Sequence, residues 1–83
     1  MEPYKWYRAS EVLPEDTDFP KDSNGVVGFF NVALHNGDLY CVNRWYDNLN
    51  DRWYWDADDD YYDRMILRDG ITHWMKIEQP ALP

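Results

Sequence analysis

The side chains best able to do chemistry lie between positions 47 and 63, where seven aspartates stand with a single arginine. Asp56, Asp58 and Asp60 have the spacing of the first three ligands of an EF-hand loop. That loop needs glycine at its sixth position and glutamate at its twelfth, where this chain has Tyr61 and Leu67. We therefore predict a solvated acidic loop, no metal site and no cofactor. A weak, non-specific Ca²⁺ or Mg²⁺ site is the alternative.

The thiol and imidazole groups do not form a recognisable reactive set. One cysteine and two histidines are present, without the CxxC or HxxxH spacing of a zinc site. Cys41 falls in mid-strand on the face of Trp45, so we expect a buried, inert thiol. His73 shares a strand face with Ile71 and Met75 and is expected to be a hydrogen-bonded core residue. The carboxylates crowd into loops open to water, whereas catalytic carboxylates are usually desolvated. We predict no catalytic residue and no enzymatic activity.

Aromatic side chains are the more informative feature, with five Trp, seven Tyr and three Phe. Residues 45–46 and 53–55 place Trp and Tyr on adjacent predicted strands, whose successive residues face opposite ways. A thin sheet cannot bury both faces in so short a chain, so some rings are expected to be exposed. Exposed aromatics beside acidic loops favour a protein-binding surface. The alternative is one aromatic core whose polar tips stay in water.

The predicted binding surface combines those rings with carboxylates. Its rim is expected to comprise Asp47, Asp51, Asp56, Asp58, Asp59, Asp60, Tyr61 and Tyr62, with Trp53 or Trp55 as the anchor. Eight basic against sixteen acidic residues give a net charge of −8. This charge repels nucleic acid and attracts a basic protein partner. The simpler interpretation is that the charge only keeps an aromatic-rich domain soluble.

The chain has no feature of a secreted or membrane protein. No segment approaches the roughly 20 apolar residues of a membrane span. The N-terminus lacks an apolar stretch, and the single cysteine allows no internal disulfide. We therefore expect no membrane association and a reducing cytoplasm.

Period-two patterns predict a mainly β, single-domain fold over residues 1–83, with an antiparallel sheet of four or five strands. Phe30, Val32 and Leu34 share one face of the clearest strand. The following Asn36 and Gly37 predict a type I′ hairpin turn. Strands are expected over residues 1–8, at the sheet edge, and over 26–35, 38–46, 52–56 and 71–77. The three middle strands form a meander.

Helical structure is expected to be limited to one or two short turns, which leaves an α+β description open. Residues 56–68 begin with carboxylates, which suit a helix N-terminus, and Gly70 suits its end. The tyrosine pair in this segment fits a strand equally well. The other place is Ser10, which would cap a turn that Pro14 stops. Phe19 is expected to anchor the loop that follows, and Pro80 and Pro83 to end regular structure.

Two short motifs lie at opposite ends of the chain. Trp6, Leu13 and Pro14 have the spacing W-x6-L-P, and residues 72–75 read T-H-W-M. Together they resemble a family of small phage and prophage proteins catalogued as domain of unknown function 551. The resemblance implies a phage-type origin, and it implies that the first and last strands lie side by side. It assigns no catalytic residue. It implies fold-defining roles for Trp6, Leu13, Thr72, His73, Trp74 and Met75.

The leading hypothesis is a non-enzymatic phage or prophage accessory protein that binds a protein partner in the cytoplasm of a bacterial host. One alternative is a small-ligand module that stacks carbohydrate on Trp45, Trp53 and Trp55. Another is an acidic mimic of DNA that occupies a basic nucleic-acid groove. Salt would separate the hypotheses, because a mimic loses affinity steeply as ionic strength rises.

Overall fold

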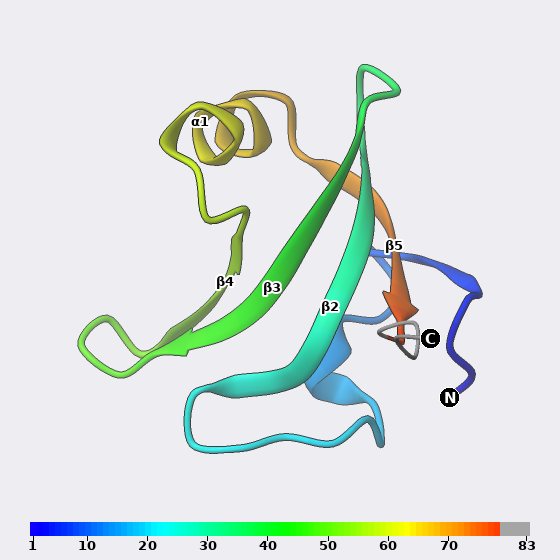
Figure 1. Cartoon of the computed structure of the whole chain (residues 1–83), viewed down its shortest axis with the longest axis vertical. Helices are drawn as coiled ribbons and strands as arrows, with labels where there is room; N and C mark the ends of the chain where they lie inside the picture. Colours follow the sequence, from blue (N-terminus) through cyan, green and yellow to red (C-terminus); the bar gives the residue numbers. More distant parts are fainter. Residues whose placement is uncertain (79–83) are drawn as a thin grey trace, which may run out of the picture.

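Alternating apolar and polar residues form strands in five segments of the computed structural model, which describes residues 1–78 (Figure 1). The predicted mainly β fold with four or five antiparallel strands is confirmed. The predicted end of regular structure at Pro80 and Pro83 lies outside the described residues. The elements are β1 (Trp6–Arg8), a 3-10 turn (Pro14–Asp16), β2 (Gly25–Leu34), β3 (Leu39–Asp47), β4 (Arg52–Asp56), α1 (Asp60–Asp69) and β5 (Ile71–Ile77).

The strands form one sheet in the order β1-β5-β2-β3-β4. Strands β2, β3 and β4 are the predicted meander. The first strand pairs antiparallel with the last, and Tyr7 lies opposite Trp74. This confirms the predicted neighbouring positions of the two chain ends, and it confirms β1 as an edge strand. The other edge is β4, so the sheet stays open.

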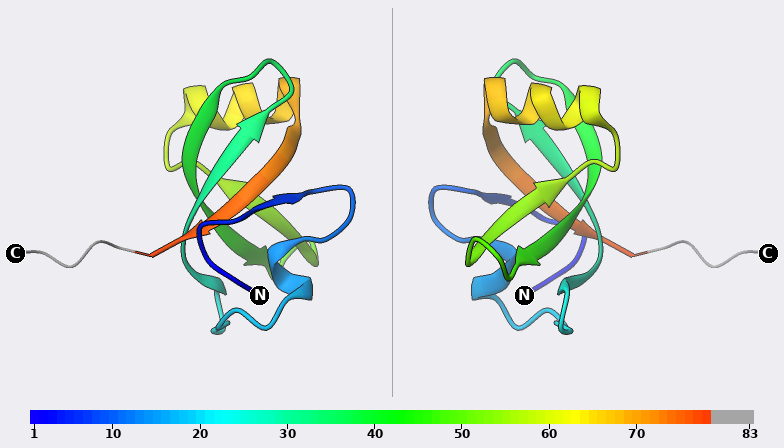
Figure 2. Two further views of the ribbon diagram at one scale, coloured as in Figure 1. Left: turned by 90° about the vertical axis from the view of Figure 1, so that its right-hand side faces the viewer. Right: turned by 90° about the vertical axis from the view of Figure 1, so that its left-hand side faces the viewer.

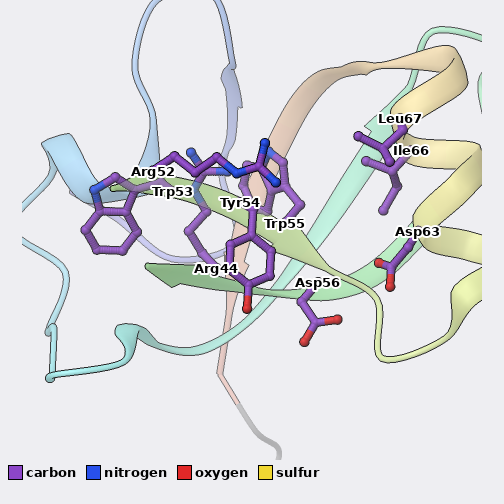
Figure 3. A pocket seen from close by; sticks show the side chains of 9 residues that line it. All are labelled: Arg44, Arg52, Trp53, Tyr54, Trp55, Asp56, Asp63, Ile66 and Leu67. Atoms are coloured by element: carbon purple, nitrogen blue, oxygen red, sulfur yellow. The ribbon is translucent and has the colours of Figure 1, made fainter. Parts of the chain in front are cut away.

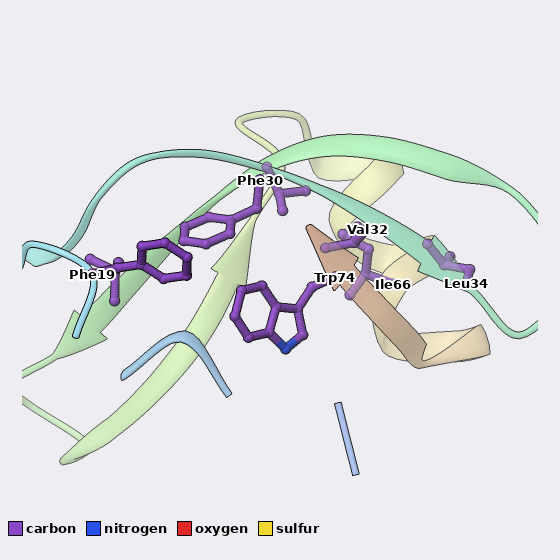
Figure 4. Close-up of a cluster of buried hydrophobic side chains, with 8 residues drawn as sticks. Phe19, Phe30, Val32, Leu34, Ile66 and Trp74 are labelled. Carbon is purple, nitrogen blue, oxygen red and sulfur yellow. The ribbon is translucent and has the colours of Figure 1, made fainter. Parts of the chain in front are cut away.

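The core lies on one face of the curled sheet, and α1 extends across one end of it (Figure 2). Trp74 is fully buried at its centre, with its ring 5.0 Å from that of Tyr7 and 5.7 Å from that of Phe30. Phe19, in the loop between the 3-10 turn and β2, is buried in the core and anchors the loop, as predicted. The hydrophobic core cluster of the described residues comprises Phe19, Val26, Phe30, Val32, Leu34, Val42, Ile66 and Trp74 (Figure 4).

Two predicted core residues lie on the opposite face of the sheet. Cys41 is exposed, because the core face of β3 carries its neighbour Val42, which pairs with the buried Phe30. His73 is only partly buried, and its Nδ1 lies 3.0 Å from the hydroxyl of Thr72. A strand with apolar residues on both faces does not show which face is buried, and pairing with β2 decides it.

Two turns differ from the sequence prediction. Gly37 has φ +95° and Asn36 does not have a positive φ, whereas a type I′ turn needs positive φ at both. The Gly37 N–H donates to the Leu34 carbonyl, which gives a three-residue loop that ends in glycine. Pro14 begins the 3-10 turn rather than stopping a helix, because its fixed φ suits a first helical position.

The ten-residue helix α1 begins and ends at residues suited to those positions, which confirms helix over strand in this segment. The Asp59 carboxylate accepts the backbone N–H of Tyr61 at 2.8 Å and that of Tyr62 at 3.4 Å. At the other end, Gly70 has φ 76° and ψ 154°, a conformation that is essentially restricted to glycine.

We expect Asp59→Ala to lower the free energy of unfolding by roughly 0.5–2 kcal/mol, because two helical N–H groups lose their acceptor. Thermal unfolding followed by circular dichroism measures the change. Asp60→Ala is the matched control, because it removes a carboxylate from the same turn and leaves the capping bonds in place. Equal losses in the two variants would contradict a capping role.

Candidate protein-binding site

The predicted binding residues form two groups at opposite ends of β4. Asp47 and Asp51 flank the β3–β4 turn, whereas Asp56 ends β4 and residues 57–62 form the loop into α1 and its first turn. Since each strand residue advances the chain by about 3.3 Å, the five residues of β4 separate the groups by roughly 15 Å. The structure therefore does not bring them into one rim, and the seven aspartates of positions 47–63 do not form a continuous row of charge.

The Asp47 carboxylate organises the β3–β4 turn. It accepts the Asn50 side-chain amide at 2.7 Å and the backbone N–H groups of Leu49 at 3.0 Å and of Asn50 at 3.3 Å. The Asn50 amide, followed by those backbone bonds, lowers the pKa of Asp47 below its ordinary value of 3.8. Asp47 therefore has a structural role within the β3–β4 turn.

Because the folded-state pKa of Asp47 is depressed, its contribution to stability is present above pH 3.8 and is lost as the pH falls through the folded-state pKa. We expect Asn50→Ala to move the pKa of Asp47 back toward 3.8. A ¹³C carboxyl titration by NMR measures it. The pKa of Asp18, which the N-terminal ammonium lowers through a separate contact, is the internal control and should not change. An unchanged Asp47 would contradict the role of the amide.

Trp45, Trp53 and Trp55 do not lie on the same face of the sheet. Trp53 and Trp55 face the core side and pack against it, and the Trp55 ring lies edge-on to Phe30 at 5.7 Å. Trp45 lies on the other face, where its indole N–H donates to Asp56 at 2.8 Å. Neither Trp53 nor Trp55 stands free as the predicted anchor, and a carbohydrate platform of all three rings is not formed.

A buried ion pair between Arg44 and Glu15 lies against the Trp55 ring, and no sequence pattern indicates it. Arg44 is 5% exposed, and its guanidinium donates two hydrogen bonds of 2.9 Å to the Glu15 carboxylate. It also lies 4.5 Å from the centre of the Trp55 ring. Pairing and stacking satisfy a charge that would otherwise be costly to bury. Because Glu15 is 29 residues away in sequence, no local pattern could have revealed the pair.

A tyrosine cluster formed by Tyr40, Tyr61 and Tyr62 lies where the start of β3 meets the first turn of α1. The ring centres of Tyr40 and Tyr62 are 4.9 Å apart, and those of Tyr61 and Tyr62 are 5.3 Å apart. Tyr61 is 60% and Tyr62 43% exposed. Asp38 accepts a long 3.5 Å hydrogen bond from the Tyr40 hydroxyl. Burial, and then the Asp38 charge, raise the pKa of Tyr40.

Some of the carboxylates around α1 accept hydrogen bonds that hold the local structure, and others are exposed to solvent. Asp56 accepts the Trp45 indole and the Asp58 N–H, Asp59 caps α1, and Asp63 accepts the Ala57 N–H at 2.8 Å. The side chains of Asp58 and Asp60 are exposed. Across residues 1–78 no group of three or more His, Cys, Asp or Glu side chains is placed to hold a metal ion. No helix in this part of the chain is long and apolar enough to span a membrane.

A groove of about 360 Å³ runs beside β4 (Figure 3). All five residues of β4 line it, together with Asp63, Ile66 and Leu67 of α1 and the side chain of Arg44. Successive strand residues point to opposite faces, so a cavity that touches five in a row must follow the strand's edge. Leu67 is 85% exposed, which is unusual for a leucine beside a core helix residue.

Comparison of the chain with protein-family models, with curated proteins and with solved structures found no match. The resemblance to the phage family, carried by the W-x6-L-P and T-H-W-M motifs, therefore stays a prediction.

Proposed function

We propose that the chain is a non-catalytic accessory protein of phage or prophage type that binds a basic protein segment in the bacterial cytoplasm. The observation that supports this proposal is the tyrosine cluster, in which Tyr62 packs against both Tyr40 and Tyr61, and Tyr61 and Tyr62 are exposed beside carboxylates. It includes Tyr61 and Tyr62, which the sequence predicts as binding residues, and adds Tyr40 and Asp38.

The cluster suits lysine and arginine side chains for two reasons. The face of a tyrosine ring attracts a cation within about 6 Å of its centre. Nearby carboxylates that have no structural partner, such as those of Asp58 and Asp60, add Coulombic attraction. Tyr residues also lose little conformational entropy on binding and are common in interface hot spots. The net charge of −8 favours encounter with a basic partner.

The test is affinity capture from bacterial lysate with the wild-type chain and with Tyr61→Ala/Tyr62→Ala, washed at low and high salt and identified by mass spectrometry. We expect one basic protein to be enriched by the wild type and lost, by about tenfold or more, with the double variant. Tyr4→Ala is the matched control, because Tyr4 is 59% exposed and lies outside the cluster. Equal capture by wild type and double variant would contradict the proposal.

The salt series distinguishes the remaining hypotheses. A tyrosine-anchored contact should keep part of its affinity at high salt, because salt does not screen the apolar contact of the rings. A DNA mimic should be released almost completely, because its affinity comes from charge.

A further inference from the structure

The edge strand β4 presents unpaired backbone groups. Within the described residues it pairs only with β3, whereas the opposite edge strand β1 is three residues long. The Tyr46 N–H donates to Asn24 at 2.8 Å, on the side of β3 away from β4. Tyr46 and Trp53, which lie opposite one another, are therefore a non-hydrogen-bonded pair. Because the two kinds of pair alternate in an antiparallel ladder, the next pair, Trp45 and Tyr54, is hydrogen-bonded. The N–H and C=O groups of Trp53 and Trp55 therefore point to the free edge.

The sequence of β4, Arg-Trp-Tyr-Trp-Asp, is complementary to itself when reversed. In an antiparallel pair of two β4 strands centred on Tyr54, each Arg52 lies opposite the Asp56 of the other copy. Each Trp53 then lies opposite a Trp55, and the two Tyr54 residues face one another. Opposite charges and aromatic pairs are the combinations that stabilise directly opposed positions in antiparallel sheets.

The backbone pattern accommodates this register, and the side chains select it among those the backbone allows. The residues whose backbone groups point outward, Trp53 and Trp55, pair with each other and exchange hydrogen bonds. Tyr54, whose groups are used by β3, occupies the non-hydrogen-bonded position on the axis. A register centred on Trp53 would instead leave Arg52 opposite a tyrosine. We infer that a second copy of this chain pairs through β4, joining two five-stranded sheets into one ten-stranded sheet about a two-fold axis at Tyr54.

The groove beside β4 supplies the space for this pairing. A strand added at the edge lies along the five residues that line the groove, and the exposed Leu67 of α1 contacts its inward side. The strand itself contains one Arg and one Asp and is neutral. Two chains of −8 repel at long range, but at about 0.15 M salt that repulsion is screened beyond roughly 8 Å. The tyrosine cluster lies outside the paired residues, so this interface does not depend on the proposed function.

Sedimentation and light scattering at about 0.15 M salt test the interface. We expect the wild type to pass from 10.1 kDa to twice that mass as its concentration rises. Tyr54→Glu and Tyr54→Lys each place like charges face to face on the axis, so each should weaken self-association at least about tenfold. An equimolar mixture of the two variants should form a heterodimer, because the opposed charges now attract. Leu49→Glu and Leu49→Lys, at the 96% exposed turn tip, are the controls and should change nothing.

A disulfide checks the register. Directly opposed residues of a non-hydrogen-bonded pair have Cα atoms about 4.5 Å apart, within the range that a disulfide spans. We expect Tyr54→Cys, made with Cys41→Ser, to give a covalent dimer on mild oxidation, and Leu49→Cys in the same background to stay monomeric. A wild type of monomer mass at every concentration overturns the inference. So does a dimer that tolerates Tyr54→Glu, and so does a folded Tyr54→Cys variant that does not cross-link.

Discussion

Replacing Glu15 with alanine is expected to destabilise the fold by about 3–5 kcal/mol, because it leaves the Arg44 guanidinium buried without its partner. The side chains of the pair are 6% and 12% exposed, so water cannot replace the lost hydrogen bonds. At about 0.05–0.15 kcal/mol per residue, 83 residues give a total stability of roughly 4–12 kcal/mol. A substantial part of the variant population should therefore be unfolded. Urea unfolding followed by tryptophan fluorescence measures the loss.

The chain contains a matched control for that substitution. Arg8 and Glu11 form an ion pair at 3.9 Å whose side chains are both 68% exposed. Glu11→Ala should change the free energy of unfolding by no more than about 1 kcal/mol, because exposed pairs contribute little. The double variant Glu15→Leu/Arg44→Met should recover much of the loss, since an apolar pair removes the unpaired buried charge. Equal losses of stability for Glu15→Ala and Glu11→Ala would show that the burial of the Arg44–Glu15 pair is not the cause of the destabilisation.

Trp74→Ala is expected to cost about 3–5 kcal/mol, since it removes the largest fully buried side chain of the core. Its ring contacts those of Tyr7, Phe19 and Phe30. Its indole N–H also donates to the Val12 carbonyl at 2.8 Å, which ties the N-terminal segment to β5. The cavity and the unsatisfied Val12 carbonyl both lower the free energy of unfolding. Far-UV circular dichroism during thermal unfolding measures the effect without relying on the lost fluorophore.

Two further substitutions separate the contributions of Trp74. Trp74→Phe keeps a packed ring but removes the bond to Val12, so it should cost clearly less than Trp74→Ala. Trp6→Ala is the control on the other face of the sheet, where Trp6 lies opposite Met75 and is 40% exposed. If Trp6→Ala were as damaging as Trp74→Ala, the sheet would have to bury both of its faces.

Only part of the proposed binding surface could be predicted from the sequence. Tyr61 and Tyr62 are predicted binding residues because they follow a run of aspartates, and they are exposed together. Tyr40 and Asp38 were missed, because the packing of the β2–β3 hairpin against α1 brings them there from more than twenty positions away. The two aspartate groups looked continuous in sequence, and the extended conformation of β4 separates them.

Local chemistry by itself determined the strands, the hairpin position and the ends of the helix. Phe30, Val32 and Leu34 alternate with more polar neighbours, so their buried face follows from period two. Asp59 and Gly70 fix the ends of α1 through bonds and φ values that depend on a few adjacent residues.

Tertiary structure alone decided which face of β3 and β5 is buried and which distant charges meet. Both strands carry apolar residues on each side, so the burial of Val42 and Trp74, and the exposure of Cys41, depend on register with β2. A shift of one residue would exchange the two faces, and only the packed core distinguishes the alternatives. Arg44 meets Glu15 for the same reason: a pair separated by 29 residues forms only after the sheet has set the positions of both side chains.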